Sequence, residues 1–502
     1  MAESVTAGLA GDSVEARRLV EQGIALRRQG RLDEAVRAYE GAIAASPNLA
    51  EAHYNLGVAR RLQGREDEAI ACWQQAVLLR PTFVEAYNNL GAALLPQGQV
   101  EAAITCHRRA LAIEPQSLPG LVNLGNALRL AERPRDAVES YRRAIALVPD
   151  DAMTWGNLGL VLQDLGELME AEEAYRRAIR LKPDYAEVHK SLALLLLLTG
   201  RFAEGWAEYG WRWRTRALAA HRLSAPAWRG ENLRGRTLLL HAEQGLGDTI
   251  MACRLVSALV LRGARVVLEV QPELARLIRG LEGVAEVLPR GAPLPKADMA
   301  ASLFDLPGPL WLDLHNIPAT VPYLAAEPER VAHWRAALDA RPGFKVGIVW
   351  QGNRHSIADL GRSPPLAAFA ALAAVPGVRL ISLQKGEGGE QLDAMPMVER
   401  LPGALDPGPD AFLDTAAVMQ CLDLVISADT APAHLAGALG RPVWLALKRV
   451  ADWRWLLDRD DNPWYPTARL FRQERAGDWD AVFARMAEVL AKEVLAQEAE
   501  GR

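Results

Sequence analysis

The sequence predicts an α plus α/β fold class, with a helical solenoid followed by two doubly wound parallel-sheet lobes. Three observations predict it. A 34-residue period runs through the first two-fifths of the 502-residue chain. A strand, a glycine loop, a helix and a second strand follow from residue 237 onward, and the same order begins again at residue 344. A chain of this length also exceeds one hydrophobic core, since domains average ~150 residues.

Small, bulky and helix-ending residues at fixed positions carry the 34-residue period. The glycine series is Gly30, Gly64, Gly98, Gly166 and Gly200, with Glu132 in the remaining place, and the bulky series is Tyr39, Trp73, His107, Tyr141, Tyr175 and Tyr209. Small residues let paired antiparallel helices approach, and bulky ones fill the grooves between pairs. Residues 155–159 (WGNLG) match the W-x-x-L-G signature of tetratricopeptide repeats. We therefore expect about six such repeats over residues 15–216, after a flexible stretch at 1–14.

One polar position also repeats in each unit, and each of its members is followed by leucine and glycine. The column consists of Asn55, Asn89, Asn123 and Asn157. One interpretation is a helix residue typical of these repeats with no further role. The other is a ladder of amides along the concave groove that binds a protein, peptide or other polymer, since solenoid grooves are common binding surfaces.

Composition and charge exclude several classes of protein. The net charge of −5 gives no reason to expect a nucleic-acid partner. The four cysteines have neither CxxC nor zinc-ligand spacing, so we expect no metal site. No apolar stretch approaches the ~20 residues that cross a bilayer, and the first residues lack the basic start and apolar core of a signal peptide. We predict a cytoplasmic protein with no transmembrane segment.

After residue 216 the repeat pattern gives way to short apolar runs. Residues 217–235 contain scattered proline and glycine and are predicted to be a linker. Rossmann-like strand–loop–helix units then predict a first lobe over 236–340 and a second over 341–475. The last segment, 476–502, is predicted to contain an amphipathic helix. Two such lobes in tandem enclose a cleft, where ligands usually bind.

Three motifs fall where the carboxyl end of a predicted strand meets a helix, which is where open α/β sheets bind ligands. The first is QGLGD, in which Gly245 and Gly247 let backbone N–H groups approach a ligand and Asp248 stands near a helix start. The same pattern also suits a plain turn with a capping aspartate. The absence of G-x-G-x-x-G with a later ribose-binding acid disfavours a nicotinamide enzyme.

The second motif is WQGN at residues 350–353, which leads toward Arg362. Gly352 and Asn353 form a glycine loop, and the Arg362 guanidinium suits a phosphate because it makes charge-assisted hydrogen bonds. The alternative is a flexible loop between the lobes in which Arg362 is only solvated.

The third motif, residues 425–444, carries the most information. Asp429 and Thr430 open a helix, and helix N-termini bind phosphate through free N–H groups and the helix dipole. Ala431 is small and keeps that helix close to a ligand. A single histidine is usually a core residue, but the position of His434 beside Asp-Thr at a helix start favours contact with a pyrophosphate or ribose hydroxyl.

Together the three motifs resemble glycosyltransferase family 9, the heptosyltransferase-like enzymes of the GT-B fold, over roughly residues 236–475. The pattern D-T-x-x-x-H-L-A-x-A-L-G-x-P is the most specific part, and G-L-G-D adds to it in combination. The whole arrangement resembles bacterial proteins that fuse tetratricopeptide repeats to such a GT-B-like pair of lobes. Its architecture is similar to that of O-linked N-acetylglucosamine transferases.

The resemblance implies metal-independent, inverting transfer of a sugar from a nucleotide-sugar donor, a co-substrate rather than a cofactor. Asp248 would be the general base that takes a proton from the acceptor hydroxyl. The donor would be bound by Gly245, Gly247, Gly352, Asn353, Arg362, Gln384, Lys385, Asp429, Thr430, Ala431 and His434. The acceptor would be a protein or polymer recruited by the solenoid. Two alternatives are a non-catalytic scaffold with a degenerate nucleotide-sugar-binding domain and a nucleotide-sugar epimerase.

Overall fold

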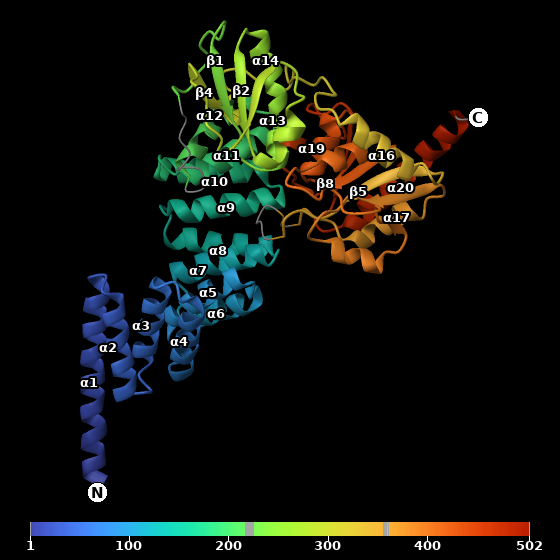
Figure 1. The fold of residues 1–502 in the computed structure, drawn as a ribbon. Helices are drawn as coiled ribbons and strands as arrows, with labels where there is room; N and C mark the ends of the chain where they lie inside the picture. Colours follow the sequence, from blue (N-terminus) through green and yellow to red (C-terminus); the bar gives the residue numbers. More distant parts are fainter. Residues whose placement is uncertain (1, 216–224, 355–358, 360, 501–502) are drawn as a thin grey trace. The chain divides into compact units, whose positions relative to one another are not determined.

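The computed structural model describes residues 2–215, 225–354, 359 and 361–500. The chain divides into two compact units, Met1–Val188 and His189–Arg502 (Figure 1). Residues 217–224 of the predicted linker lie outside the described residues. Within the described part of the chain, no helix has both the length and the apolar character that a membrane span requires.

The first unit consists of antiparallel helix pairs stacked side by side (Figure 1). Its helices are α1 (Ala2–Arg28), α2 (Leu32–Ala45), α3 (Ala50–Leu62), α4 (Glu66–Leu79), α5 (Val84–Leu94), α6 (Val100–Ile113), α7 (Leu118–Leu130), α8 (Pro134–Leu147), α9 (Ala152–Leu165) and α10 (Leu168–Leu181). Helix α1 begins within the stretch 1–14 that the sequence analysis left outside the repeats. The helix pairs confirm the predicted solenoid.

In the four helix pairs from α3/α4 to α9/α10, a ring of the second helix lies on a glycine of the first helix. A Cβ atom added to any of these glycines would come within 2.5–2.6 Å of ring atoms, closer than real contacts allow. The pairs are Gly57 with Trp73, Gly91 with His107, Gly125 with Tyr141, and Gly159 with Tyr175. Packing against these rings therefore explains the glycine that follows each Asn-Leu of the asparagine column.

The other glycine series ends helices in the left-handed backbone region. The φ angles of these five glycines lie between 74° and 80°. Glu132 occupies the same position after α7 with a φ of 55°. A side chain in this region costs about 1–2 kcal/mol, whereas glycine adopts it freely. Glu132 is therefore the one strained member of the series.

We expect Glu132→Gly to stabilise the first unit by roughly 0.5–1 kcal/mol. Relief of about 1–2 kcal/mol of backbone strain outweighs the roughly 0.4–1 kcal/mol of entropy that a new glycine adds to the unfolded chain. Denaturant unfolding of the full chain, followed by helical circular dichroism, measures the change. The matched control is Glu139→Gly, at an exposed position inside α8, which should destabilise the unit by about 0.5–1 kcal/mol. If both substitutions changed the free energy of unfolding by the same amount, the backbone at Glu132 would not be strained.

The second unit begins with the helices of the sixth repeat, α11 (Ala186–Leu198) and α12 (Phe202–Tyr209), followed by the short 3₁₀ helix η2 (Gly210–Arg214). These helices fall within the predicted solenoid of residues 15–216, whereas the break between the two compact units falls at residue 188. The reason is apolar packing: Leu197 and Trp206 are buried in the same hydrophobic core as Leu238 and Leu268 of the first sheet.

The first sheet is parallel, with the strand order β3-β2-β1-β4. Its strands are β1 (Thr237–His241), β2 (Arg265–Val270), β3 (Val284–Pro289) and β4 (Met299–Ser302), with helices α13 (Leu246–Ala252), α14 (Val256–Leu261) and α15 (Ala275–Ile278) and the 3₁₀ turn η5 (Leu303–Asp305). Because β4 returns to the far side of β1, the strand order reverses between these two strands.

The second sheet is also parallel, with the order β10-β9-β8-β5-β6-β7 that defines a doubly wound Rossmann-like sheet. Its strands are β5 (Phe344–Val349), β6 (Val378–Ser382), β7 (Val398–Glu399), β8 (Leu424–Ala428), β9 (Val443–Leu447) and β10 (Ala468–Arg472). Its helices are α16 (Pro328–Leu338), α17 (Ala370–Ala373), α18 (Leu413–Met419), α19 (Ala431–Ala438) and α20 (Trp479–Glu500), and η9 (Trp453–Trp455) is a 3₁₀ turn. The α plus α/β fold class is thus confirmed.

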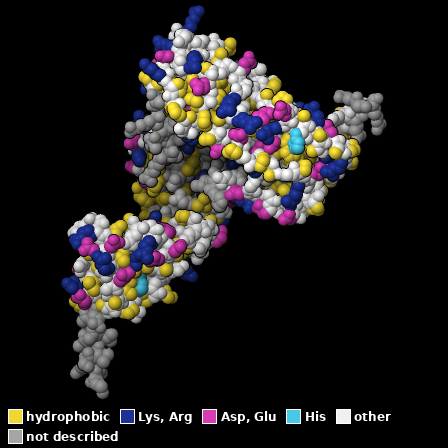
Figure 2. Space-filling model, viewed as in Figure 1, with side chains coloured by type: hydrophobic (Ala, Val, Ile, Leu, Met, Phe, Trp, Pro, Cys, Tyr) yellow, Lys and Arg dark blue, Asp and Glu magenta, His cyan; other side chains and the backbone are white. Residues whose placement is uncertain are grey.

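Both faces of the second sheet are covered, so its strands β8 and β9 are apolar except for Ser427. Every residue of β8 and β9 is buried, as expected for a parallel sheet between two layers. Helix α20 packs Val482, Phe483 and Met486 against one face. On the molecular face shown in Figure 2, basic and acidic side chains are interspersed.

Candidate functional site

A cavity lies where the strand order of the second sheet reverses, between the carboxyl ends of β5 and β8. Its volume is about 590 Å³, within the range of small-molecule sites. Of the predicted donor-binding residues, those lining this cavity, here called the β5–β8 cavity, are Gly352, Asn353, Gln384, Lys385, Thr430 and Ala431. Leu246 is the first-lobe residue that completes the wall. Because Leu246 belongs to QGLGD, residues of all three motifs line this cavity.

The N-terminus of α19 opens on the β5–β8 cavity. Thr430 is the N-cap residue, but its side chain makes no capping hydrogen bond. Its hydroxyl instead lies 3.0 Å from the Ser427 hydroxyl, because it points back toward the end of β8. Pro432 lies in the first turn, where it removes one N–H. The Ala433 N–H donates to the Thr430 carbonyl at 3.0 Å, and Ala431, the first residue of the helix, lines the cavity, so the positive end of the α19 dipole borders a space that can hold an anion.

The β5 loop leaves no room for a side chain at Gly352. A Cβ atom there would lie 2.7 Å from the Asp359 carboxylate and 2.8 Å from a terminal nitrogen of Arg362. Arg362 is therefore held against the loop, with its Nε 3.3 Å from Asp359 Oδ1, and is not merely solvated. Ser363 completes the arrangement, because its hydroxyl donates to Asp359 and accepts from the Gly352 N–H.

Gln384 braces the β5 loop with its whole amide. Its oxygen accepts from the backbone N–H groups of Trp350 and Gln351 at 3.1 and 3.0 Å, and its NH₂ donates to the carbonyls of Gln351 and Glu387. The Gln384 side chain thus borders the cavity while its hydrogen bonds are committed to backbone. The neighbouring Lys385 donates to the Asp406 carbonyl at 2.7 Å.

Asp248 lies in the first turn of α13 and contacts the second lobe. Its Oδ2 accepts from the Gly245 N–H at 2.9 Å, and its Oδ1 forms an ion pair with Arg454 of η9. Arg454 also pairs with Asp452 at 2.7 Å and is 7% exposed. Arg454 and Asp452 are site residues that the sequence motifs did not predict; their sequence signal is limited to an arginine between two tryptophans.

The first and third motifs are in direct contact. A Cβ atom added to Gly247 would lie 3.0 Å from both the Ala431 Cα and a ring carbon of His434. His434 is buried, with its Nδ1 3.0 Å from the Tyr465 hydroxyl and its ring stacked on Trp455 at 5.2 Å. Gly247 therefore serves close packing of α13 on α19, which places the adjacent Asp248 beside the N-terminus of α19.

Burial is the largest cause of the pKa shifts of Asp248, Asp429 and His434. It raises the pKa of the Asp248 carboxyl, against the opposing effect of Arg454. Burial and the nearby Asp452 carboxylate raise the pKa of Asp429 to about 6, and Arg362 opposes this shift. Burial, assisted by Arg454, lowers the pKa of His434 well below its ordinary value, so this imidazole is neutral at physiological pH. No cluster of three or more potential metal-ligating His, Cys, Asp or Glu side chains occurs among the residues described.

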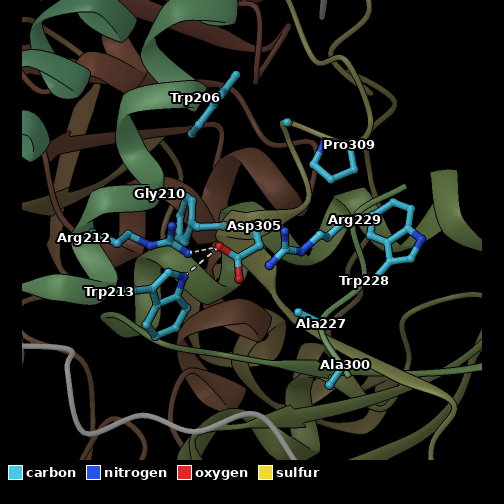
Figure 3. A pocket seen from close by; sticks show the side chains of 12 residues that line it. Trp206, Gly210, Arg212, Trp213, Ala227, Trp228, Arg229, Ala300, Asp305 and Pro309 are labelled. Atoms are coloured by element: carbon cyan, nitrogen blue, oxygen red, sulfur yellow. Dashed lines mark hydrogen bonds and ion pairs between the residues drawn. The ribbon is translucent and has the colours of Figure 1, made fainter. Parts of the chain in front are cut away.

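A second cavity, of about 530 Å³, lies beside β4 in the first lobe. Trp206 of α12, Arg212 and Trp213 of η2, Trp228, and Phe304 and Asp305 of η5 are among the residues that line it. Figure 3 shows Arg212 and Trp213 pointing at the Asp305 carboxylate, to which both donate hydrogen bonds. One of its lining residues, Phe304, lies near the ion pair of Asp248, since the centre of its ring is 5.5 Å from the Arg454 guanidinium carbon.

The asparagine column lies on the first helix of successive pairs. Asn55 is buried and donates to the Glu51 carbonyl of its own helix at 2.8 Å. Asn89 and Asn157 are half-buried, and each reaches the preceding first helix: Asn89 donates to the Tyr54 hydroxyl, and Asn157 lies 3.4 Å from the Asn126 amide oxygen. Asn123 is also half-buried, on α7. Part of each of the last three amides therefore remains accessible.

Comparison with known families assigns both regions of the chain. Models of tetratricopeptide repeats match residues 23–64, 59–98, 82–150 and 152–185. A model of glycosyltransferase family 9 (heptosyltransferase) matches residues 408–447, which contain β8, α19 and β9. The chain carries tetratricopeptide repeats and, at residues 408–447, a segment similar to glycosyltransferase family 9. That match does not extend to the first two motifs.

Individual relatives share the same organisation or part of it. Protein FlbA of Caulobacter vibrioides is 30% identical over 319 residues, which are 59% of this chain and 53% of FlbA. The chain thus spans about half the length of this curated relative, whose origin agrees with the predicted bacterial architecture. The crystal structure of MamA is 28% identical, with a TM-score of 0.31, and covers 33% of this chain and 96% of MamA. YrrB, described as a TPR protein with an unusual peptide-binding site, is 19% identical, with a TM-score of 0.33, over 38% of this chain and 98% of its own.

Proposed function

We propose that this chain transfers a sugar from a nucleotide-sugar donor to a protein or other polymer recruited by its repeats. The observation that carries the proposal is the position of Asp248 on the first lobe, beside the uncapped N-terminus of α19 on the second. A carboxylate and an anion site that face each other from two lobes are what group transfer from a diphosphate needs. Family 9 similarity over residues 408–447 supports the same chemistry.

In the proposed reaction the donor diphosphate lies against the first turn of α19. The helix dipole and the cations Arg362 and Lys385 stabilise the negative charge that develops on the leaving diphosphate, without a metal ion. Asp248 accepts the proton of the acceptor hydroxyl as its oxygen attacks the anomeric carbon. Burial raises the pKa of Asp248, which brings this base closer to neutral pH. Attack opposite the leaving group in one displacement inverts the anomeric centre.

A binding and release assay tests this proposal. Thermal shift with UDP-glucose, UDP-N-acetylglucosamine, GDP-mannose and ADP-glucose ranks the donors, because a bound ligand stabilises by about 2.7 kcal/mol at 100 times its Kd. The best of these, the panel donor, is then assayed for release of its nucleoside diphosphate. Binding without release would favour the non-catalytic scaffold, and conversion of the free donor to another sugar would favour the epimerase.

Donor binding should weaken as pH rises through 6, because Asp429 then loses its proton beside the diphosphate. The raised pKa keeps Asp429 neutral below about pH 6, while the donor diphosphate carries the same charge throughout. His434 stays neutral and does not contribute. Repulsion of about 1 kcal/mol gives a roughly fivefold weaker Kd at pH 8 than at pH 5. Calorimetric titration of the panel donor measures it; Asp429→Asn should flatten the profile, and a flat wild-type profile would exclude this effect.

The asparagine column should matter for the acceptor and not for the donor. We expect the double variant Asn89→Ala and Asn157→Ala to lower transfer of labelled sugar to polypeptide at least threefold, with unchanged donor hydrolysis in water. Loss of two amide contacts of about 0.5–1.5 kcal/mol each would produce such a change. Asn48→Ala, in the exposed turn between α2 and α3, is the matched control. Unchanged transfer in the double variant would assign the column to packing.

A further inference from the structure

The loop that leads from β1 into α13, the helix of Asp248, is joined to the end of the last repeat by a buried ion pair. Arg212 of η2 donates from Nε and Nη2 to the two carboxylate oxygens of Glu243, at 2.8 and 3.0 Å. Both side chains are 1% exposed. Arg212 also pairs with Asp305 at 2.7 Å, as Figure 3 shows. Glu243 directly precedes the QGLGD motif, so the pair holds the start of that loop.

Further hydrogen bonds fix the same loop from the last repeat and from the first sheet. Gln244 donates to the Tyr209 hydroxyl of α12 at 2.6 Å. Gln271, at the end of β2, donates to the Gln244 carbonyl at 2.7 Å, and Ser302 donates to Glu243 at 2.6 Å. The loop between β1 and α13 is therefore held on one side by the sheet and on the other by the sixth repeat.

A buried ion pair is rarely the simplest way to stabilise a core, because desolvation of both charges offsets their attraction, and apolar residues often serve as well. A bidentate arginine–carboxylate pair does supply a defined geometry. Here that geometry is applied one residue before the motif whose last member contacts Arg454. Arg212 also stacks on the rings of Tyr209 and Trp213, which orients its guanidinium further.

We propose that Arg212 is a positioning residue, which sets the place of Asp248 through Glu243 and makes the sixth repeat a working part of the transfer site. The inference rests on the proposed function. It adds that the end of the repeat array and the loop between β1 and α13 are held rigidly to each other. A change in the sixth repeat then alters turnover without touching the β5–β8 cavity.

The test uses the full chain and the panel donor. Arg212→Met should lower the kcat of nucleoside diphosphate release at least tenfold, while the donor Kd changes less than threefold. Arg212→Lys keeps the positive charge but loses the two parallel hydrogen bonds of the guanidinium, so its kcat should lie between those of Arg212→Met and the wild type. In the Arg212 variants the acidic limb of the pH–kcat profile should move to lower pH. A displaced Asp248 is less buried, and burial is what raises its pKa. Arg214→Met is the matched control, because Arg214 is exposed and stacks on Trp211 in the same 3₁₀ helix.

The double variant Arg212→Met with Glu243→Gln guards against misfolding, since it removes the buried Glu243 charge together with its partner, and the partly exposed Asp305 keeps its hydrogen bond from Trp213. We expect it to fold and bind donor normally, with kcat as low as in Arg212→Met. Wild-type kcat in the double variant and in Arg212→Lys would overturn the inference. A wild-type chain that binds the panel donor and never releases diphosphate would instead overturn the proposed function, so the two failures are distinct.

Discussion

Replacing Asp248 with asparagine should lower nucleoside diphosphate release from the panel donor by about 10²–10⁴-fold, the usual contribution of a general base. The substitution preserves shape and leaves an amide oxygen to accept the Gly245 N–H, so α13 keeps its start. Donor Kd should change less than threefold, because the β5–β8 cavity is lined mainly by the second lobe. Steady-state kinetics and calorimetry measure the two quantities separately.

The control for Asp248 is Asp313→Asn. Asp313 is an exposed aspartate of the same lobe that accepts a hydrogen bond from the His315 N–H in a loop, and its variant should have wild-type kcat. If Asp248→Asn and the wild type release diphosphate at the same rate, Asp248 is not the base, and the site binds a donor without the proposed chemistry.

Replacing Arg454 with methionine should destabilise the second unit by about 3–5 kcal/mol, the usual result of removing one partner of a buried ion pair. Arg454 is the cation that contacts both Asp248 and Asp452, and its loss leaves these carboxylates next to Asp429 without that counter-charge. The pKa of Asp429 should therefore rise above about 6, because Arg454 is one of the groups that hold it down. Activity should fall together with stability.

Tryptophan fluorescence during denaturant unfolding measures the Arg454 effect. Only Trp73 and Trp155 of the 14 tryptophans lie in the first unit, so this signal reports mainly on the second. Arg459→Met is the matched control, since Arg459 pairs with Asp461 near the surface five residues later, where such pairs contribute about 0–1 kcal/mol. A loss no larger than that of the control would show that Arg454 is dispensable to the fold.

Much of the candidate site was predictable because it depends on short patterns. A strand that ends at a glycine loop and a helix start places its residues at the carboxyl edge of a sheet, and β5 and β8 do bring Asn353 and Thr430 to one cavity. Gln384 follows β6 and lies at the carboxyl edge of the second sheet, where its motif placed it. Its hydrogen bonds to the β5 loop depend on side-chain orientation, which no local pattern specifies.

By itself, the sequence determined the repeat architecture, the recurring glycines with Glu132 as the exception, and the two successive sets of strands and motifs that form the parallel sheets. Each of these depends on residues a few positions apart, where backbone geometry translates spacing directly into structure. Only the tertiary structure decided that the units divide at residue 188, that Arg454 contacts Asp248 from 206 residues away, and that Arg212 holds Glu243. Such pairings depend on how whole elements pack, because burial and charge compensation act between residues that the chain brings together only on folding.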